Sequence, residues 1–105
     1  MSGISTHVLD TAAGKPAAGI PVHLFRGEHE VSSGITNQDG RCAALLPSDA
    51  RLEQDIYRLV FDISAQFPDG FYPKIEISFR IADASGHYHV PLLLSPFGYT
   101  TYRGS

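Results

Sequence analysis

Apolar and polar residues alternate along several segments of this chain, which is the pattern of strands with one buried face. Residues 20–25 and 57–63 show it, and residues 74–81 show it most clearly, with an apolar face opposite a charged one. Such segments suit antiparallel sheets that have one face on the core and one in water. No sustained apolar period of 3.6 residues is present, so any helix is expected to be a short turn near residues 48–54 or 64–67.

Turn signals separate these strands at short intervals. Glycine, proline and small polar residues gather at residues 12–19, 67–73 and 82–86. The sequence NQDG at residues 37–40 predicts a tight turn, because glycine takes a positive φ without steric cost. Seven or eight short strands at this spacing predict an all-β protein, a β-sandwich that forms a single domain over residues 1–105.

Composition then narrows the class of protein. Eight Lys and Arg residues stand against eleven Asp and Glu, and no basic run is present, so nucleic-acid binding through phosphate contacts is not expected. The longest apolar stretch, residues 90–94, is too short to cross a bilayer. The first ten residues show no secretory signal, and with Cys42 as the single cysteine no intrachain disulfide forms. These features predict a soluble cytoplasmic domain without membrane or nucleic-acid partners.

The five histidines are the first candidates for chemistry. His29 lies in a polar stretch and His23 alternates with an apolar strand face, so both are expected at the surface. His87 and His89 lie on one face of a strand and could together bind a metal ion. A catalytic zinc site generally needs a third protein ligand. No Cys or acidic residue at a telling spacing supplies one, so no metal site is expected.

Two further residues and the C-terminal segment add to the candidates. His7 falls in the middle of a strand with Ser5 on its face, and Arg41 directly follows the NQDG turn. Taken singly, His7, Arg41 and His89 are more often structural than catalytic, and spacing alone does not show that they meet. Residues 99–103 are either an ordinary last strand or part of a site. No G-x-S-x-G, P-loop or G-x-G-x-x-G motif supports a nucleophile-elbow hydrolase or a nucleotide-binding fold.

Several motifs in order carry a resemblance over nearly the whole chain: HVLD, GKPA, TNQDGR, HYHVPLLLSP and the closing YRGS. Together they resemble the 5-hydroxyisourate hydrolase family, the transthyretin-like proteins of purine catabolism, and YRGS is the most specific of them. The resemblance implies a transthyretin-like β-sandwich of two four-stranded antiparallel sheets with at most one short helix. It also implies a homotetramer, a dimer of dimers, with active sites at the dimer–dimer interface.

The resemblance also assigns roles to residues of this chain. It implies that the catalytic residues are His7, Arg41, His89 and Ser105. His7 and Arg41, with Tyr102, are implied to bind the substrate, and no cofactor or metal is implied. His87 is the neighbour of the motif histidine and is left out of the site. The stretch from Asp62 to the FYP sequence is shorter than in many family members, so the helix found there is expected to be reduced to a turn.

The reaction implied is the hydrolytic ring opening of 5-hydroxyisourate to 2-oxo-4-hydroxy-4-carboxy-5-ureidoimidazoline, in the degradation of urate to allantoin. His89 is the preferred general base, with His7 orienting the water or sharing its proton, and Arg41 is expected to hold the substrate and stabilise the oxyanion.

Two alternatives stay open at this point. One is a transthyretin-type carrier, which shares the framework but lacks the histidines and the arginine at the matching places. The other is an adhesion or carbohydrate-binding sandwich, which would normally show a secretion signal. The joint presence of His7, Arg41, His89 and YRGS favours the enzyme over both.

Overall fold

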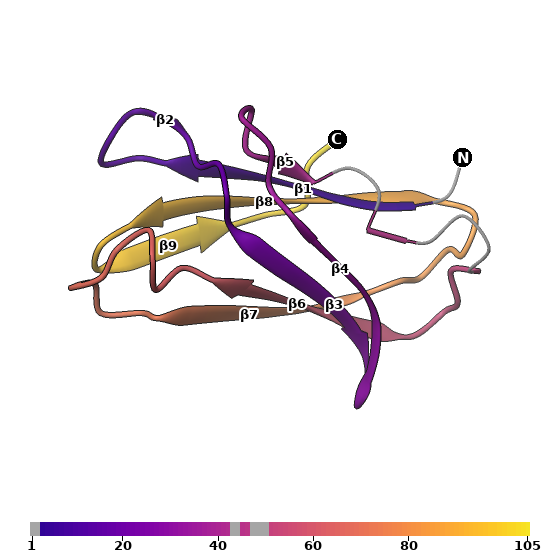
Figure 1. The fold of residues 1–105 in the computed structure, drawn as a ribbon. Helices are drawn as coiled ribbons and strands as arrows, with labels where there is room; N and C mark the ends of the chain where they lie inside the picture. The colour runs from indigo at the N-terminus through magenta and orange to yellow at the C-terminus, as the bar shows by residue number, and fades with distance from the viewer. Residues whose placement is uncertain (1–2, 43–44, 47–50) are drawn as a thin grey trace.

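Two β-sheets face each other in the computed structural model of the chain (Figure 1), which describes residues 3–42, 45–46 and 51–105. One sheet has the order β2-β1-β8-β9, with β5 also paired to β1, and the other has the order β4-β3-β6-β7. The strands are β1 (Gly3–Asp10), β2 (Lys15–Pro16), β3 (Pro21–Arg26), β4 (His29–Ile35), β5 (Arg41–Cys42), β6 (Ile56–Asp62), β7 (Lys74–Arg80), β8 (His87–Ser95) and β9 (Gly98–Thr101). The predicted all-β sandwich is confirmed.

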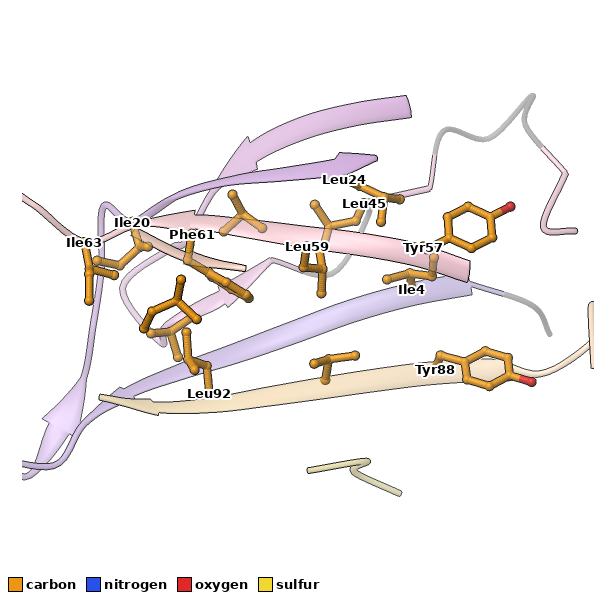
Figure 2. Close-up of a cluster of buried hydrophobic side chains, with 14 of the residues drawn as sticks. Ile4, Ile20, Leu24, Leu45, Tyr57, Leu59, Phe61, Ile63, Tyr88 and Leu92 are labelled. Atoms are coloured by element: carbon orange, nitrogen blue, oxygen red, sulfur yellow. The ribbon is translucent and has the colours of Figure 1, made fainter. Parts of the chain in front are cut away.

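The core fills the space between the two sheets with alternate side chains of their inner faces (Figure 2). As the alternation of residues 57–63 predicts, every second side chain of β6 is buried, with Tyr57 only 1% exposed. In β8, Val90, Leu92 and Leu94 are buried. Ile77 and Phe79 of β7 are only half-buried, although the alternation places them on the core face. Their exposed part lies at a hollow described below.

The first sheet differs from the predicted antiparallel four-stranded sheet in two ways. It has five strands, because the two-residue strands β2 and β5 both pair with β1. In addition, β1 and β8 run parallel, with registers from Gly3 opposite His87 to Asp10 opposite Leu94. Parallel neighbours need a long crossover, which the whole second sheet supplies here. Period-two alternation shows which face of a strand is buried, but it does not encode the direction of the neighbouring strand.

The segment after β6 is a turn, as the shortened sequence predicts. Residues 64–66 are turn residues, and the Phe67 N–H donates to the carbonyl of Ile63 at 3.0 Å. No helix occurs in the described residues, and therefore none there is suited to crossing a membrane. Of the other segment considered for a short helix, residues 51–54 are irregular and residues 48–50 lie outside the described part.

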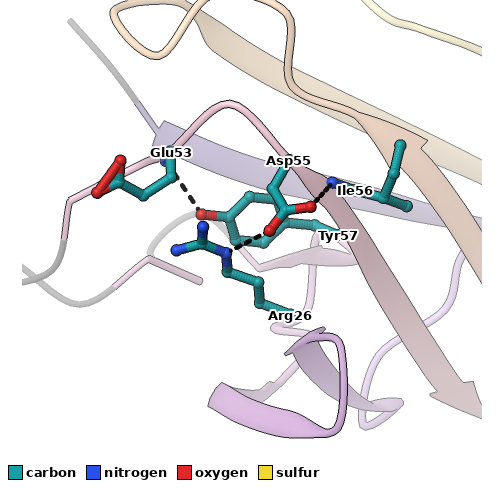
Figure 3. Close-up of polar contacts among 5 residues, drawn as sticks. All are labelled: Arg26, Glu53, Asp55, Ile56 and Tyr57. Carbon is teal, nitrogen blue, oxygen red and sulfur yellow. Dashed lines mark hydrogen bonds and ion pairs between the residues drawn. The ribbon is translucent and has the colours of Figure 1, made fainter.

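Polar contacts fix the irregular segment that enters β6, in the second sheet (Figure 3). Arg26 Nε donates to Asp55 Oδ2 at 2.7 Å, and this bond lowers the pKa of Asp55. The Tyr57 hydroxyl accepts the Glu53 N–H at 3.1 Å. Since the ion pair is exposed, its contribution to stability is small. These contacts hold the segment that leads into β6. The candidate site lies elsewhere, in the first sheet.

Candidate active site

The NQDG turn places Arg41 directly beside His7. Asn37 Oδ1 accepts the N–H groups of Asp39 and Arg41 at 2.9 and 3.0 Å, which closes the turn on its own side chain. Gly40 has φ of +75°, and a Cβ there would lie 2.3 Å from the carbonyl oxygen of a β1 residue, so only glycine allows this approach. As a result Arg41 is the register partner of His7.

His7 is held by the same turn. Its Nε2 lies 2.8 Å from the carbonyl oxygen of Asp39, and a carbonyl only accepts hydrogen bonds, so Nε2 carries the proton. In the neutral ring, Nδ1 is therefore the nitrogen with the free lone pair. The turn thus fixes both the position of His7 and its tautomer, and it holds Arg41 opposite His7 in the pairing of β1 with β5.

The parallel pairing of β1 with β8 brings a second group of side chains together. Ser5 is the register partner of His89, and both lie on the outer face of the sheet. The Ser5 hydroxyl is 2.9 Å from His89 Nδ1 and 3.0 Å from His87 Nε2. Two imidazoles therefore share one buried serine, although the sequence separates Ser5 from them by more than eighty residues.

The C-terminal segment closes over His89. Gly104 forms an isolated antiparallel bridge with His89, and its N–H donates to the His89 carbonyl at 2.8 Å. A Cβ on Gly104 would lie only 2.6 Å from His89 Cδ2, so the imidazole packs directly against the bare backbone. This bridge sets Ser105 beside His89 and Arg41, along an open hollow of about 240 Å³ that Ser5, Thr6 and His87 also line.

Tyr102 lies outside this hollow. The last strand ends at Thr101, two residues earlier than residues 99–103 predict, and Tyr102 is 58% exposed. Tyr102 lines a neighbouring hollow of about 270 Å³ with the half-buried Ile77 and Phe79, and His89 borders both hollows. The following residue, Arg103, stacks over the ring of Tyr88 at 4.5 Å.

The electrostatics of the cluster favour a neutral His89. Burial, as the main cause, lowers the pKa of His89 below its ordinary value of 6.5. The positive charge of Arg41 and then the neighbouring histidines act in the same direction, while a hydrogen bond with the backbone of Ser5 opposes them. A neutral imidazole near pH 7 is the form that accepts a proton, so His89 is suited to be a general base.

The described residues do not form a metal site. No three His, Cys, Asp or Glu side chains among them gather closely enough to hold a metal ion. The pair His87 and His89, considered as possible ligands, is instead joined through the Ser5 hydroxyl.

The structure thus brings His89, Arg41 and Ser105 into one hollow, with His7 paired to Arg41 at its edge. Sequence reasoning did not give a role to Ser5, left out His87 and did not single out Gly104. The alternation places Ser5 with His7 and His87 with His89. Their meeting depends on the register between β1 and β8, and no local pattern encodes that register.

Comparison with known proteins shows the family of the chain. The model of the HIUase/Transthyretin family matches residues 4–104. The chain belongs to this family. It is 45% identical to the 5-hydroxyisourate hydrolase of Halalkalibacterium halodurans, over the full length of both chains.

Solved structures of the family have the same fold. The 5-hydroxyisourate hydrolase of Klebsiella pneumoniae is similar with a TM-score of 0.90 and 37% identity, over 100% of both chains. Sea bream transthyretin in complex with thyroxine is similar with a TM-score of 0.88 and 25% identity, over 96% of this chain and 93% of the transthyretin chain. The HIUase/Transthyretin fold therefore occurs in both an enzyme and a thyroxine-binding protein. The fold does not distinguish these two functions, so the distinction must come from the side chains of the site.

Proposed function

We propose that this protein is a 5-hydroxyisourate hydrolase, which opens the six-membered ring of its substrate by hydrolysis in the degradation of urate. The observation that carries the proposal is the convergence of His89, Arg41 and Ser105 on one hollow, with His7 as the register partner of Arg41. Relatives with this name that align over nearly the whole chain support it. A carrier of an aromatic ligand has no need for a neutral imidazole next to a guanidinium.

In the proposed reaction His89 activates the attacking water. Its lowered pKa keeps the imidazole neutral near pH 7, so that it can accept a proton from water as the oxygen attacks the ring carbonyl. His7 presents its Nδ1 lone pair, because its Nε2–H is bound to the Asp39 carbonyl, and this nitrogen orients the water. One histidine is thus the base and the other positions the nucleophile.

Arg41 binds the substrate and stabilises the charge that develops on it. A guanidinium is planar and always charged, and its fork of donors matches a flat ureide rich in carbonyl groups. Donors aimed at a developing oxyanion typically contribute about 3 kcal/mol each to the transition state. We propose that Ser105, which lines the hollow, holds a water or the substrate edge, and that Tyr102, which lines the neighbouring hollow, contacts the substrate.

The steps balance without a further reactant. Water adds its hydroxyl to the carbonyl carbon while His89 takes the proton, and the tetrahedral intermediate then collapses with cleavage of the ring carbon–nitrogen bond. His89 returns the proton to the departing nitrogen, which gives a carboxylic acid that ionises in water. Because imidazole and guanidinium supply both the base and the charge, we propose that the reaction requires neither metal nor cofactor.

We further propose that the active enzyme is a homotetramer, a dimer of dimers, in the cytoplasm. The hollow lies on the outer face of a sheet and is open, so on a single chain it encloses little of a small substrate. Two such faces meeting across a symmetry axis would form a cleft from the same residues twice. Assembly and activity are then linked.

The test is to generate 5-hydroxyisourate in solution from urate and to follow its spectral decay with and without the protein. We expect the protein to accelerate the decay, and His89→Ala and Arg41→Ala each to lose most of the acceleration while gel filtration shows an unchanged assembly. His29→Ala, at an exposed position of the other sheet, is the matched control and is expected to remain fully active. A decay rate that the protein leaves unchanged would refute the hydrolase.

A further inference from the structure

The Ser5 hydroxyl links the two histidines of β8 in a way that restricts their protons. Its oxygen lies within hydrogen-bond distance of His87 Nε2 and His89 Nδ1 at once, and Ser5 is only 8% exposed. A hydroxyl has one proton and two lone pairs, and among the described residues only these two ring nitrogens lie within reach of the Ser5 hydroxyl proton, so the hydroxyl is fully bonded when it donates to one ring and accepts from the other. Each neutral imidazole also carries a single N–H, so the proton on one ring determines where the proton of the other must be.

Two arrangements satisfy both bonds and also give the Ser5 hydroxyl proton an acceptor when the rings are neutral. In the first, His89 Nδ1–H donates to Ser5 and the Ser5 hydroxyl donates to His87, which leaves the lone pair of His89 on Nε2. In the second, His87 Nε2–H donates to Ser5 and the hydroxyl donates to His89 Nδ1, which puts the proton of His89 on Nε2. Only the first arrangement leaves a base on the ring nitrogen that does not bind Ser5.

We propose that Ser5 and His87 are positioning residues for His89: neutral His87 accepts the Ser5 hydroxyl, Ser5 accepts His89 Nδ1–H, and Nε2 of His89 is thereby kept as the base. The kinetic part of this inference rests on the proposed hydrolase function, whereas the tautomer of His89 is a property of the protein alone. Gly104 supports the same role, because its backbone packs on the ring edge next to Nε2.

A consequence is that His87 switches the base off when it is protonated. Protonated His87 has N–H groups on both nitrogens, so Ser5 accepts from it, and the Ser5 hydroxyl proton then has His89 Nδ1 as its one acceptor among the described residues. The second arrangement then follows, and His89 Nε2 loses its lone pair without being charged itself. His87 is exposed and open to solvent protons, whereas His89 is half-buried. The loss of activity at low pH should therefore involve fewer protons in a variant that lacks His87 than in wild type.

Other groups around the pair set the background for this effect. The titratable and charged groups that face it are His7 of β1, Arg41 of β5 and, around the neighbouring hollow, Arg80 of β7 with Tyr102 and Arg103 of the C-terminal segment. Since all of these groups are the same in the variants below, a difference between them isolates His87.

The tautomer is measured directly on the full-length protein labelled with ¹⁵N-histidine, by two-bond ¹H–¹⁵N correlation spectra at neutral pH. The His89 signals are assigned with His89→Gln, and His87→Gln assigns the neighbouring ring. We expect His89 to be protonated at Nδ1 and unprotonated at Nε2, and Ser5→Ala to give a mixture of tautomers. Wild-type His89 protonated at Nε2 would overturn the proposal whatever the protein's activity. Absence of hydrolase activity together with the expected tautomer would overturn only the proposed function.

Kinetics supply the second readout. Ser5→Ala is expected to lower kcat roughly three- to tenfold, the usual range for one hydrogen bond, with KM unchanged, and Ser5→Thr to restore it. His87→Gln keeps a hydrogen-bond partner but does not titrate, so the acidic limb of its pH–rate profile should involve one proton fewer than wild type. His29→Gln is the control and should keep the wild-type limb. An acidic limb of equal steepness in wild type and His87→Gln would contradict the switch.

Discussion

Gly104→Ala tests whether the backbone of the C-terminal segment positions His89. The added Cβ would lie 2.6 Å from His89 Cδ2 and 3.1 Å from Pro91 Cγ, both too close for carbon atoms. Gly104 has no positive φ, so alanine brings no backbone strain and the effect is steric alone. To relieve the contact, the imidazole must turn away from its rotamer or the segment must lift from β8.

The magnitude follows from what each movement breaks. Turning His89 off its rotamer costs about 1 kcal/mol, and losing its hydrogen bond with Ser5 costs about another 1 kcal/mol. If both fall on the transition state, kcat/KM drops roughly 30-fold. In the free protein the surface segment can lift from β8 and avoid most of this cost, so the free energy of unfolding should fall by less than about 1 kcal/mol; the full cost is met only when catalysis requires the segment and His89 in place.

The assay is the decay of 5-hydroxyisourate together with thermal or urea unfolding of the same preparation. Gly98→Ala is the matched control, because its Cβ would meet only Ser95 Oγ at an ordinary 3.6 Å. We expect Gly98→Ala to keep activity close to wild type. Wild-type kcat/KM in Gly104→Ala would refute the reasoning, and so would a loss of stability large enough to account for the lost activity.

Three further predictions concern other parts of the molecule. A peptide tag placed after Ser105 should lower kcat/KM about tenfold by crowding the hollow, while the same tag before residue 1 should not, and the melting temperatures of both should agree; equal activities would count against a role for Ser105. In His87→Gln, where only His89 is left to switch off the base, the acidic limb of the pH–rate profile should have its midpoint below 6.5, since a lowered pKa keeps His89 neutral, and therefore active, further into acid; a midpoint above 6.5 in this variant would contradict this. Leu92→Ala should cost about 2–5 kcal/mol in urea unfolding, because Leu92 is fully buried between the sheets, and a cost below about 1 kcal/mol would show a loosely packed core.

The alternation of apolar residues predicted the sandwich because burial of a strand face is a local property of the sequence. Tyr57, Leu59 and Phe61 are buried as the pattern indicates. The NQDG turn could also be predicted from the sequence, because the asparagine side chain and the glycine act within a few residues of Arg41. For the candidate residues of the site, a resemblance of motifs was needed, because nothing local shows that His7 and Arg41 meet.

What could not be predicted depends on contacts between distant strands. The parallel direction of β1 and β8 and their register bring Ser5 onto His87 and His89, and neither is encoded in any one segment. The same holds for Tyr102, whose strand ends earlier than its sequence indicates and which turns to the neighbouring hollow. Sequence patterns thus predicted which face of a strand is buried, but not which strands pair with each other.

The parallel pair of β1 and β8 has a consequence for synthesis of the protein. Ser5 leaves the ribosome long before His89, which follows 84 residues later, so β1 must wait for its neighbour until nearly all of the chain has been made. Pairings this distant in sequence form slowly, and the half-built sheet exposes its edge meanwhile. A nascent chain that stalls before β8 is made lacks His89 and should therefore be inactive. The activity per molecule of a preparation then reports the fraction of its chains that were completed.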